Sequence, residues 1–175
     1  MAKLRKMLGA ADSPYIVSLM RLIETQSKGT IVNWCVDYAQ QYILPIYERA
    51  CPGDVRPREA LIAAHDWLAG KIKLPAAKQK ILTAHAAARE VEENPAAQAA
   101  ARAVGQAAST IHVATHSLGI AFYGAAAIAY DRVGISEAPE VYDRIAAEEC
   151  AKMEATLRAV AVQDEKNPAK INWRC

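Results

Sequence analysis

Two histidines four residues apart, His112 and His116, lie in a stretch that contains no Asp, Glu, Lys or Arg. On an α-helix this spacing places both imidazoles on one face, which suits coordination of a zinc ion. His65 or His85 would then supply a third ligand. The same spacing also fits imidazoles that hydrogen-bond inside a helical core and fix its register. The spacing alone is a weak indication of a metal site. We therefore favour histidines that hydrogen-bond within the core, and a zinc site is the alternative.

The residues around the paired histidines complete no catalytic motif. Val113, Ala114 and Thr115 separate the two rings, so the H-E-x-x-H motif of zinc peptidases is not formed. The nearby Ser and Thr hydroxyls are expected to bond to the carbonyl one helical turn earlier. The sequence also contains no G-x-S-x-G elbow and no glycine-rich phosphate loop after a strand. These patterns favour a protein without catalytic activity.

Proline and glycine divide the chain into six expected helices. Proline is tolerated in the first helical turn, and glycine readily adopts the left-handed conformation that ends a helix. We predict helices near residues 14–27, 30–50, 57–69, 75–93, 95–132 and 138–164. Pro45 should kink or split the second, because it removes an intrahelical hydrogen bond. Strand-forming residues do not cluster in alternation, so the predicted fold class is all-α, a single compact bundle of about six helices around a long central alanine-rich helix.

We expect residues 1–175 to form a single helical domain, with a flexible arm over residues 1–12 and an irregular tail over residues 165–175. A length of 175 residues with 53% hydrophobic and 23% charged residues is typical of one folded domain. From Ala103 to Tyr130 no side chain is formally charged. The alanine, glycine, hydroxyl and histidine content of this segment favours a helix buried among other helices over a membrane span.

Charge and cysteine content narrow the classes of partner. A formal net charge of +2 is too small to indicate binding to nucleic acid or to an anionic membrane. The four cysteines have no C-x-x-C spacing and do not resemble a disulfide framework. Reduced thiols and a cytoplasmic location are therefore expected. No cofactor is indicated apart from zinc or a similar metal at His112 and His116.

All four histidines occupy predicted helix faces that would point into the protein. His65 and His85 have leucine or isoleucine neighbours at helical spacing, and small residues surround His112 and His116. Tyr123 lies on the same stripe as His112 and His116, and the family resemblance given in the next paragraph adds Arg89, Arg102 and Gln106. The candidate core polar cluster, or ligand site, comprises His65, His85, Arg89, Arg102, Gln106, His112, His116 and Tyr123.

The segments REALIAAHDWL, TAHAAARE and AAARAVGQAASTIHVATHSLGIAFYGAAAIAY resemble a bacterial immunity protein family, whose small all-helical domain is likened to the fifth immunity class of polymorphic toxin systems. The resemblance runs from Arg58 to Arg132. Its most specific part is the succession Arg102, Gly105, Gln106, His112 and His116, preceded by His85 and Arg89. The resemblance implies a protein that binds a cognate toxin domain and blocks it, and it brings no catalytic residue or cofactor.

Two other functions fit the sequence. One is an oligomeric helical protein with a structural role, which would present a large self-complementary apolar interface. The other is a protein that binds a metal or small ligand through His112 and His116. Inhibitors of nucleases are often acidic, whereas this chain is slightly basic, so a toxin of another class also fits. The expected partners are a cognate protein toxin or a second copy of the chain, and not nucleic acid or a membrane.

Overall fold

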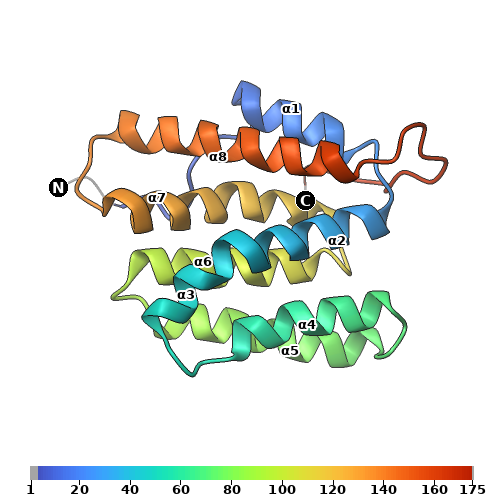
Figure 1. Ribbon diagram of the computed structural model, residues 1–175, viewed down its shortest axis with the longest axis horizontal. Coiled ribbons are helices and arrows are strands. Elements are labelled where there is room, and N and C mark those ends of the chain that lie inside the picture. The colour runs from blue at the N-terminus through green and yellow to red at the C-terminus, as the bar shows by residue number, and fades with distance from the viewer. Residues whose placement is uncertain (1–3, 175) are drawn as a thin grey trace.

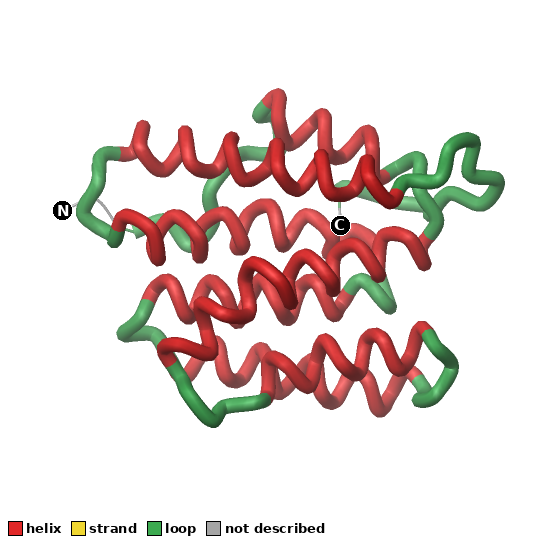
Figure 2. The backbone as a smooth tube through the Cα atoms, in the orientation of Figure 1, coloured by secondary structure: helices red, strands yellow, loops and turns green. Residues whose placement is uncertain are grey.

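The computed structural model describes residues 4–174, which form α-helices and no strand (Figure 1). The helices are α1 (Pro14–Ile23), α2 (Lys28–Tyr38), α3 (Leu44–Ala50), α4 (Arg56–Leu68), α5 (Leu74–Glu90), α6 (Pro95–Ser109), α7 (Ala125–Val133) and α8 (Pro139–Val160). A π-helical turn (Ala39–Ile43) joins α2 to α3. A 3₁₀ turn (Ala114–Ser117) and a second π-helical turn (Ile120–Gly124) lead from α6 into α7. The all-α prediction is confirmed, and Figure 2 shows the loops that connect the helices.

Prolines start the helices where the sequence predicts. Five of them lie in the first turn of α1, α4, α5, α6 and α8, respectively: Pro14, Pro57, Pro75, Pro95 and Pro139. Pro45 lies in the first turn of α3 and splits the predicted second helix. The wider π-helical turn before it, Ala39–Ile43, accommodates a residue that has no backbone N–H and clashes with the preceding turn.

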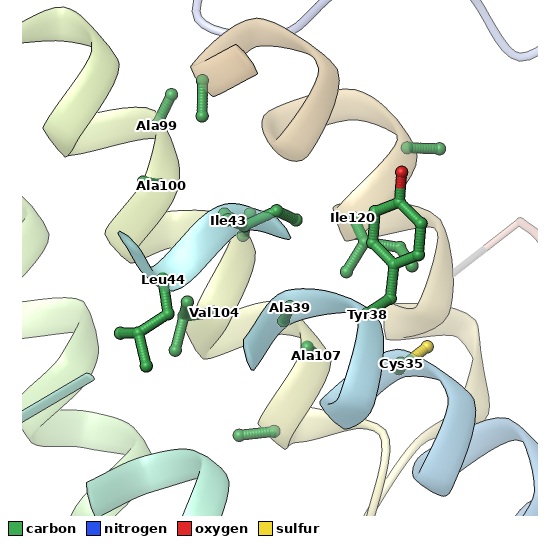
Figure 3. Packing of buried hydrophobic residues seen from close by; sticks show 14 of the residues in the cluster. Cys35, Tyr38, Ala39, Ile43, Leu44, Ala99, Ala100, Val104, Ala107 and Ile120 are labelled. Atoms are coloured by element: carbon green, nitrogen blue, oxygen red, sulfur yellow. The ribbon is translucent and has the colours of Figure 1, made fainter. Parts of the chain in front are cut away.

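Helix α6 lies at the centre of the bundle and contacts α2, α3, α4, α5 and α7. Helices α1 and α8 lie along one edge and α4 and α5 along the opposite edge (Figure 1). Most residues of α6 are buried, and most of these are alanine, which lets neighbouring helices approach closely. Ile43 and Leu44, from the junction of α2 and α3, pack against α6 beside Ala100 and Val104 (Figure 3).

The predicted continuous helix over residues 95–132 is wrong. Helix α6 ends at Ser109, and the chain folds back so that α7 packs against α6. The amides of Thr110, Ile111 and His112 bond to carbonyls three residues earlier, and the hydroxyls of Ser109 and Thr110 bond to carbonyls of α6. Hydroxyls that bond to the backbone and β-branched side chains both disfavour a continuing helix. His112 and His116 therefore do not share the face of one α-helix.

In residues 4–12, the segment predicted to be a flexible arm lies against the core. Leu8 is only 1% exposed, and its amide donates to the carbonyl of Phe122 at 3.1 Å. Arg5 forms an ion pair with Asp143 at 2.8 Å, and the Tyr130 hydroxyl donates to the Arg5 carbonyl. Residues 1–3 of the predicted arm and residue 175 of the predicted tail lie outside the described residues. Residues 161–174 follow α8 without a further helix.

The predicted buried setting of the uncharged segment is partly confirmed. Almost all of its helical residues are buried, from α6 through α7. No helix in residues 4–174 combines the length and hydropathy that a bilayer crossing requires. The turn between α6 and α7 is the exception, because His112 and Val113 are exposed there. This exposed turn brings the histidines to the surface.

Candidate functional site

The imidazole of His85 packs from α5 directly onto the backbone of α6. A Cβ atom added to Gly105 would lie 2.6 Å from Cε1 and 2.8 Å from Nδ1 of that ring. Gly105 therefore leaves the space that the imidazole fills. Partial burial lowers the pKa of His85, and the positive charges of His116, Arg89 and Arg102 lower it further.

Gln106 holds the turn that follows α6 against the helix. Its side-chain oxygen accepts a hydrogen bond from Nδ1 of His116 at 2.7 Å. Because an amide oxygen only accepts, Nδ1 of His116 carries the proton of this bond. The hydrocarbon part of Gln106 lies against Gly119, where an added Cβ would be 2.5 Å from Cγ of Gln106. Partial burial lowers the pKa of His116.

His112 lies at the surface beside His116, contrary to the predicted inward orientation. The two ring centroids are 5.7 Å apart in an edge-on arrangement, and His112 is exposed. The Lys28 ammonium donates to the carbonyl of His112 at 3.4 Å. Desolvation lowers the pKa of His112 most, followed by the positive charges of Lys78, His116 and Lys28.

The structure brings only part of the predicted cluster together. His65 pairs instead with Asp37 of α2, with 3.2 Å between Nε2 and Oδ1, and its side chain is 38% exposed. Tyr123 is half-buried and packs against the hydrophobic core. Arg102 is half-buried and lines a pocket of about 240 Å³ together with Arg5 and Lys6. The observed contacts link His116 with Gln106 and His112, and they pair His65 with Asp37 instead.

The zinc hypothesis is left with His112 and His116 as its ligands. Within residues 4–174 no group of three or more His, Cys, Asp or Glu side chains could hold a metal ion. Nδ1 of His116 is engaged with Gln106, and His65 is engaged with Asp37. Zinc in proteins normally takes three or four protein ligands. Elemental analysis of protein purified without a histidine tag tests the remaining pair.

Lysine and arginine side chains lie around the histidines. Lys28 donates to the carbonyl of His112 at 3.4 Å, and Lys78 and Arg89 flank His85 at helical spacing on α5. After desolvation, the charges of His116, Arg89 and Arg102 lower the pKa of His85. Those of Lys78, His116 and Lys28 lower the pKa of His112. No carboxylate contributes to either pKa shift. We call this set the basic strip, and it consists of Lys28, Lys78, His85, Arg89, Arg102, His112 and His116. At neutral pH its charge is carried by the lysines and arginines, because the pKa values of the three histidines are lowered.

Sequence patterns missed the two lysines of the basic strip. Lys28 lies on α2 and Lys78 on α5, far from the histidine pair along the chain. A helical pattern on α5 does indicate one of them, because Lys78, Leu82, His85 and Arg89 follow the spacing of a single face. Leu82 is 57% exposed there, so this face is open to solvent and the neighbouring lysine belongs to an accessible surface.

We expect the free energy of unfolding to fall as the pH is lowered from about 7 to about 5. The folded-state pKa values of His85, His112 and His116 are lowered, so the unfolded chain takes up protons first as the pH drops. Melting temperatures measured across this range by circular dichroism test the expectation, and a His85→Gln variant should show a shallower decline. A melting temperature that stays constant in the unsubstituted protein would contradict it.

Residues 21–156 match the family described as Imm-5 like putative immunity protein. The match covers about three quarters of the chain and includes all of α2 to α7 with most of α8. It extends beyond Arg58 and Arg132 in both directions and contains the whole basic strip. No curated protein and no solved structure matches the chain.

Proposed function

Because the chain belongs to the Imm-5 like putative immunity protein family, we propose that it binds a cognate toxin domain and neutralises it without catalysing a reaction. The family match over residues 21–156 carries this proposal. The exposed basic strip supports a role in binding, because its charged side chains lie on helices that pack against one another. Side chains held on rigid helices lose less conformational entropy when a partner binds. Neutralisation then follows from covering a surface that the toxin needs.

The arrangement around the histidines is suited to recognition of a surface. Gly105 and Gly119 let His85 and Gln106 pack tightly, which holds α5 and the 3₁₀ turn Ala114–Ser117 against α6. Exposed Leu82 and Val113 add apolar area beside the charged groups. An apolar centre with charged neighbours is typical of protein–protein interfaces.

We place this binding in the cytoplasm. The described cysteines Cys35, Cys51 and Cys150 are free thiols, which is typical of proteins in reducing compartments. Burial raises the pKa of the Cys35 thiol and raises that of Cys150 to about 12. Both groups therefore remain protonated and poorly reactive.

Co-expression with candidate toxin domains encoded by neighbouring genes tests the proposal. Cells that produce the toxin domain alone should stop growing, and cells that also produce this protein should grow normally. The two purified proteins should form a stoichiometric complex in size-exclusion chromatography. Growth arrest that persists despite soluble expression of this protein, together with no complex, would overturn the proposed function.

A further inference from the structure

The lysines and arginines of the basic strip form no ion pair with a carboxylate of residues 4–174, although the Glu90 carboxylate, which is paired with Arg56, lies near Arg89. Lys78 and Arg89 are exposed on α5, and neither they nor Arg102 form an ion pair with a carboxylate of residues 4–174. Most other arginines of the described chain do form such pairs. Glu92 lines the pocket beside Arg102 but makes no ion pair with it. Arg89 and Arg102 therefore differ from most other arginines of the described chain.

We infer that the basic strip is the docking surface for an acidic patch on the partner protein. This inference rests on the proposed function and names the chemistry of the toxin surface that is bound. Complementary potentials at an interface accelerate association and disfavour wrong partners. Arginine also forms bidentate hydrogen bonds with carboxylates, which makes Arg89 and Arg102 suited to Asp and Glu side chains of a partner.

The shape of the strip favours a folded protein surface as the occupant. Its groups come from α2, α5, α6, the turn at residues 110–113 and the 3₁₀ turn Ala114–Ser117, so they spread over several elements. Leu82 and Val113 lie exposed next to the charged residues, at 57% and 38% exposure. A partner that meets both apolar and cationic side chains needs acidic groups around an apolar patch.

The charge of the basic strip also excludes one kind of toxin surface as its direct contact. A cleft that binds nucleic acid is basic, because it neutralises phosphates. Two basic surfaces repel each other, and juxtaposed like charges are unfavourable. The strip therefore docks on an acidic face of the toxin domain and not directly on a nucleic-acid-binding cleft.

Charge reversal on α5 tests the docking surface. The double variant Lys78→Glu with Arg89→Glu should bind a toxin domain captured by the unsubstituted protein at least about tenfold more weakly than that protein does. Both side chains are exposed, so folding should be preserved, which circular dichroism checks. The matched control is Lys80→Glu on the same helix, where the ammonium lies 3.0 Å from Glu59 and outside the strip. The control should bind within about twofold of the unsubstituted protein.

The outcomes separate this inference from the proposed function. If the toxin domain binds the double variant and the unsubstituted protein equally, the docking surface is wrong and the proposed function stands. If the unsubstituted protein captures no toxin domain, the proposed function fails. A second experiment then tests which kind of ligand the basic strip binds. Its probes are a synthetic peptide of alternating Glu and Leu and an oligonucleotide of equal charge.

The peptide arm is read from the ring resonances of His85, His112 and His116. The peptide should shift these resonances in the unsubstituted protein and in Lys80→Glu, and much less in the double variant. Equal shifts in all three proteins would overturn the inference. Tighter binding of the oligonucleotide than of the peptide would assign the strip to nucleic acid and overturn the assignment to an acidic protein surface.

Discussion

Replacing Gly119 with alanine should lower the free energy of unfolding by about 3 kcal/mol. Gly119 has helical backbone angles, φ −60° and ψ −33°, at which alanine would normally be favoured. Here the added methyl group overlaps Cβ and Cγ of Gln106. Because Cβ of Gln106 is fixed to the backbone of α6, the overlap is relieved only when the turn moves away from α6. The hydrogen bond between Gln106 and His116 is then lost as well.

The measurement is thermal and urea unfolding of Gly119→Ala beside Gly29→Ala. Gly29 lies in α2, where an added Cβ meets only Oγ of Ser27 at 3.9 Å. The control should leave stability unchanged or raise it slightly, by up to about 1 kcal/mol. Gly119→Ala should lower the melting temperature by about 6–12 °C. Equal stabilities for the two variants would show that α6 and the following turn are not in close contact.

Replacing Asp54 with alanine should lower the free energy of unfolding by about 2–3 kcal/mol. The buried Tyr47 donates its hydroxyl to Oδ2 of Asp54 at 2.6 Å. The Arg56 side chain donates to both oxygens of Asp54 and pairs with Glu90 of α5 at 2.6 Å. This network ties the segment between α3 and α4 to the end of α5. Without Asp54, the buried hydroxyl of Tyr47 loses its acceptor.

Urea unfolding with Asp54→Asn and Glu48→Ala as controls isolates the cause. Asn keeps an acceptor for Tyr47 but loses the charge, so its effect should be smaller than that of alanine. Glu48→Ala removes a more exposed ion pair with Arg58 and should change stability by about 0.5 kcal/mol or less. An alanine variant at position 54 that is as stable as Glu48→Ala would contradict the role of the network.

The contribution of Asp54 to the free energy of unfolding depends on pH, because it requires the charged carboxylate. Hydrogen bonds from Arg56 hold the pKa of the Asp54 carboxyl well below its usual range. The unfolded chain has the ordinary aspartate pKa of about 3.9, so this stabilisation is complete above that pH and is lost as the pH falls below it. The histidine effect occurs at higher pH, which keeps the two contributions separate.

Local backbone chemistry explains why the helix starts were predictable and one helix end was not. Proline has a strong and local preference for the first helical turn, which identifies the starts at Pro14, Pro57 and Pro95. The end of α6 has neither proline nor glycine at residues 110–113. Alanine content and the absence of charge suggested that the helix continues. The hydroxyls and β-branched side chains of Ser109, Thr110 and Ile111 ended it instead.

The sequence correctly grouped some residues of the candidate site, but the spacing of the two histidines on one helix is not what brings them together. His85, Gln106 and His116 do come together, but through the turn and the contacts with Gly105 and Gly119. The exposed position of His112 depends on the helix break, which the spacing of four residues did not indicate. Lys28 joins the basic strip through tertiary packing of α2, and no local pattern identifies such a contact.

Amide hydrogen exchange of this protein, free and mixed with a toxin domain that it captures, tests most directly whether binding uses the basic strip. The complex should exchange more slowly in the second half of α5 and at residues 110–116, while the exposed face of α8 remains unchanged. Slower exchange confined to α8 or α4, or an intact complex with unchanged exchange at the basic strip, would contradict the proposed docking surface.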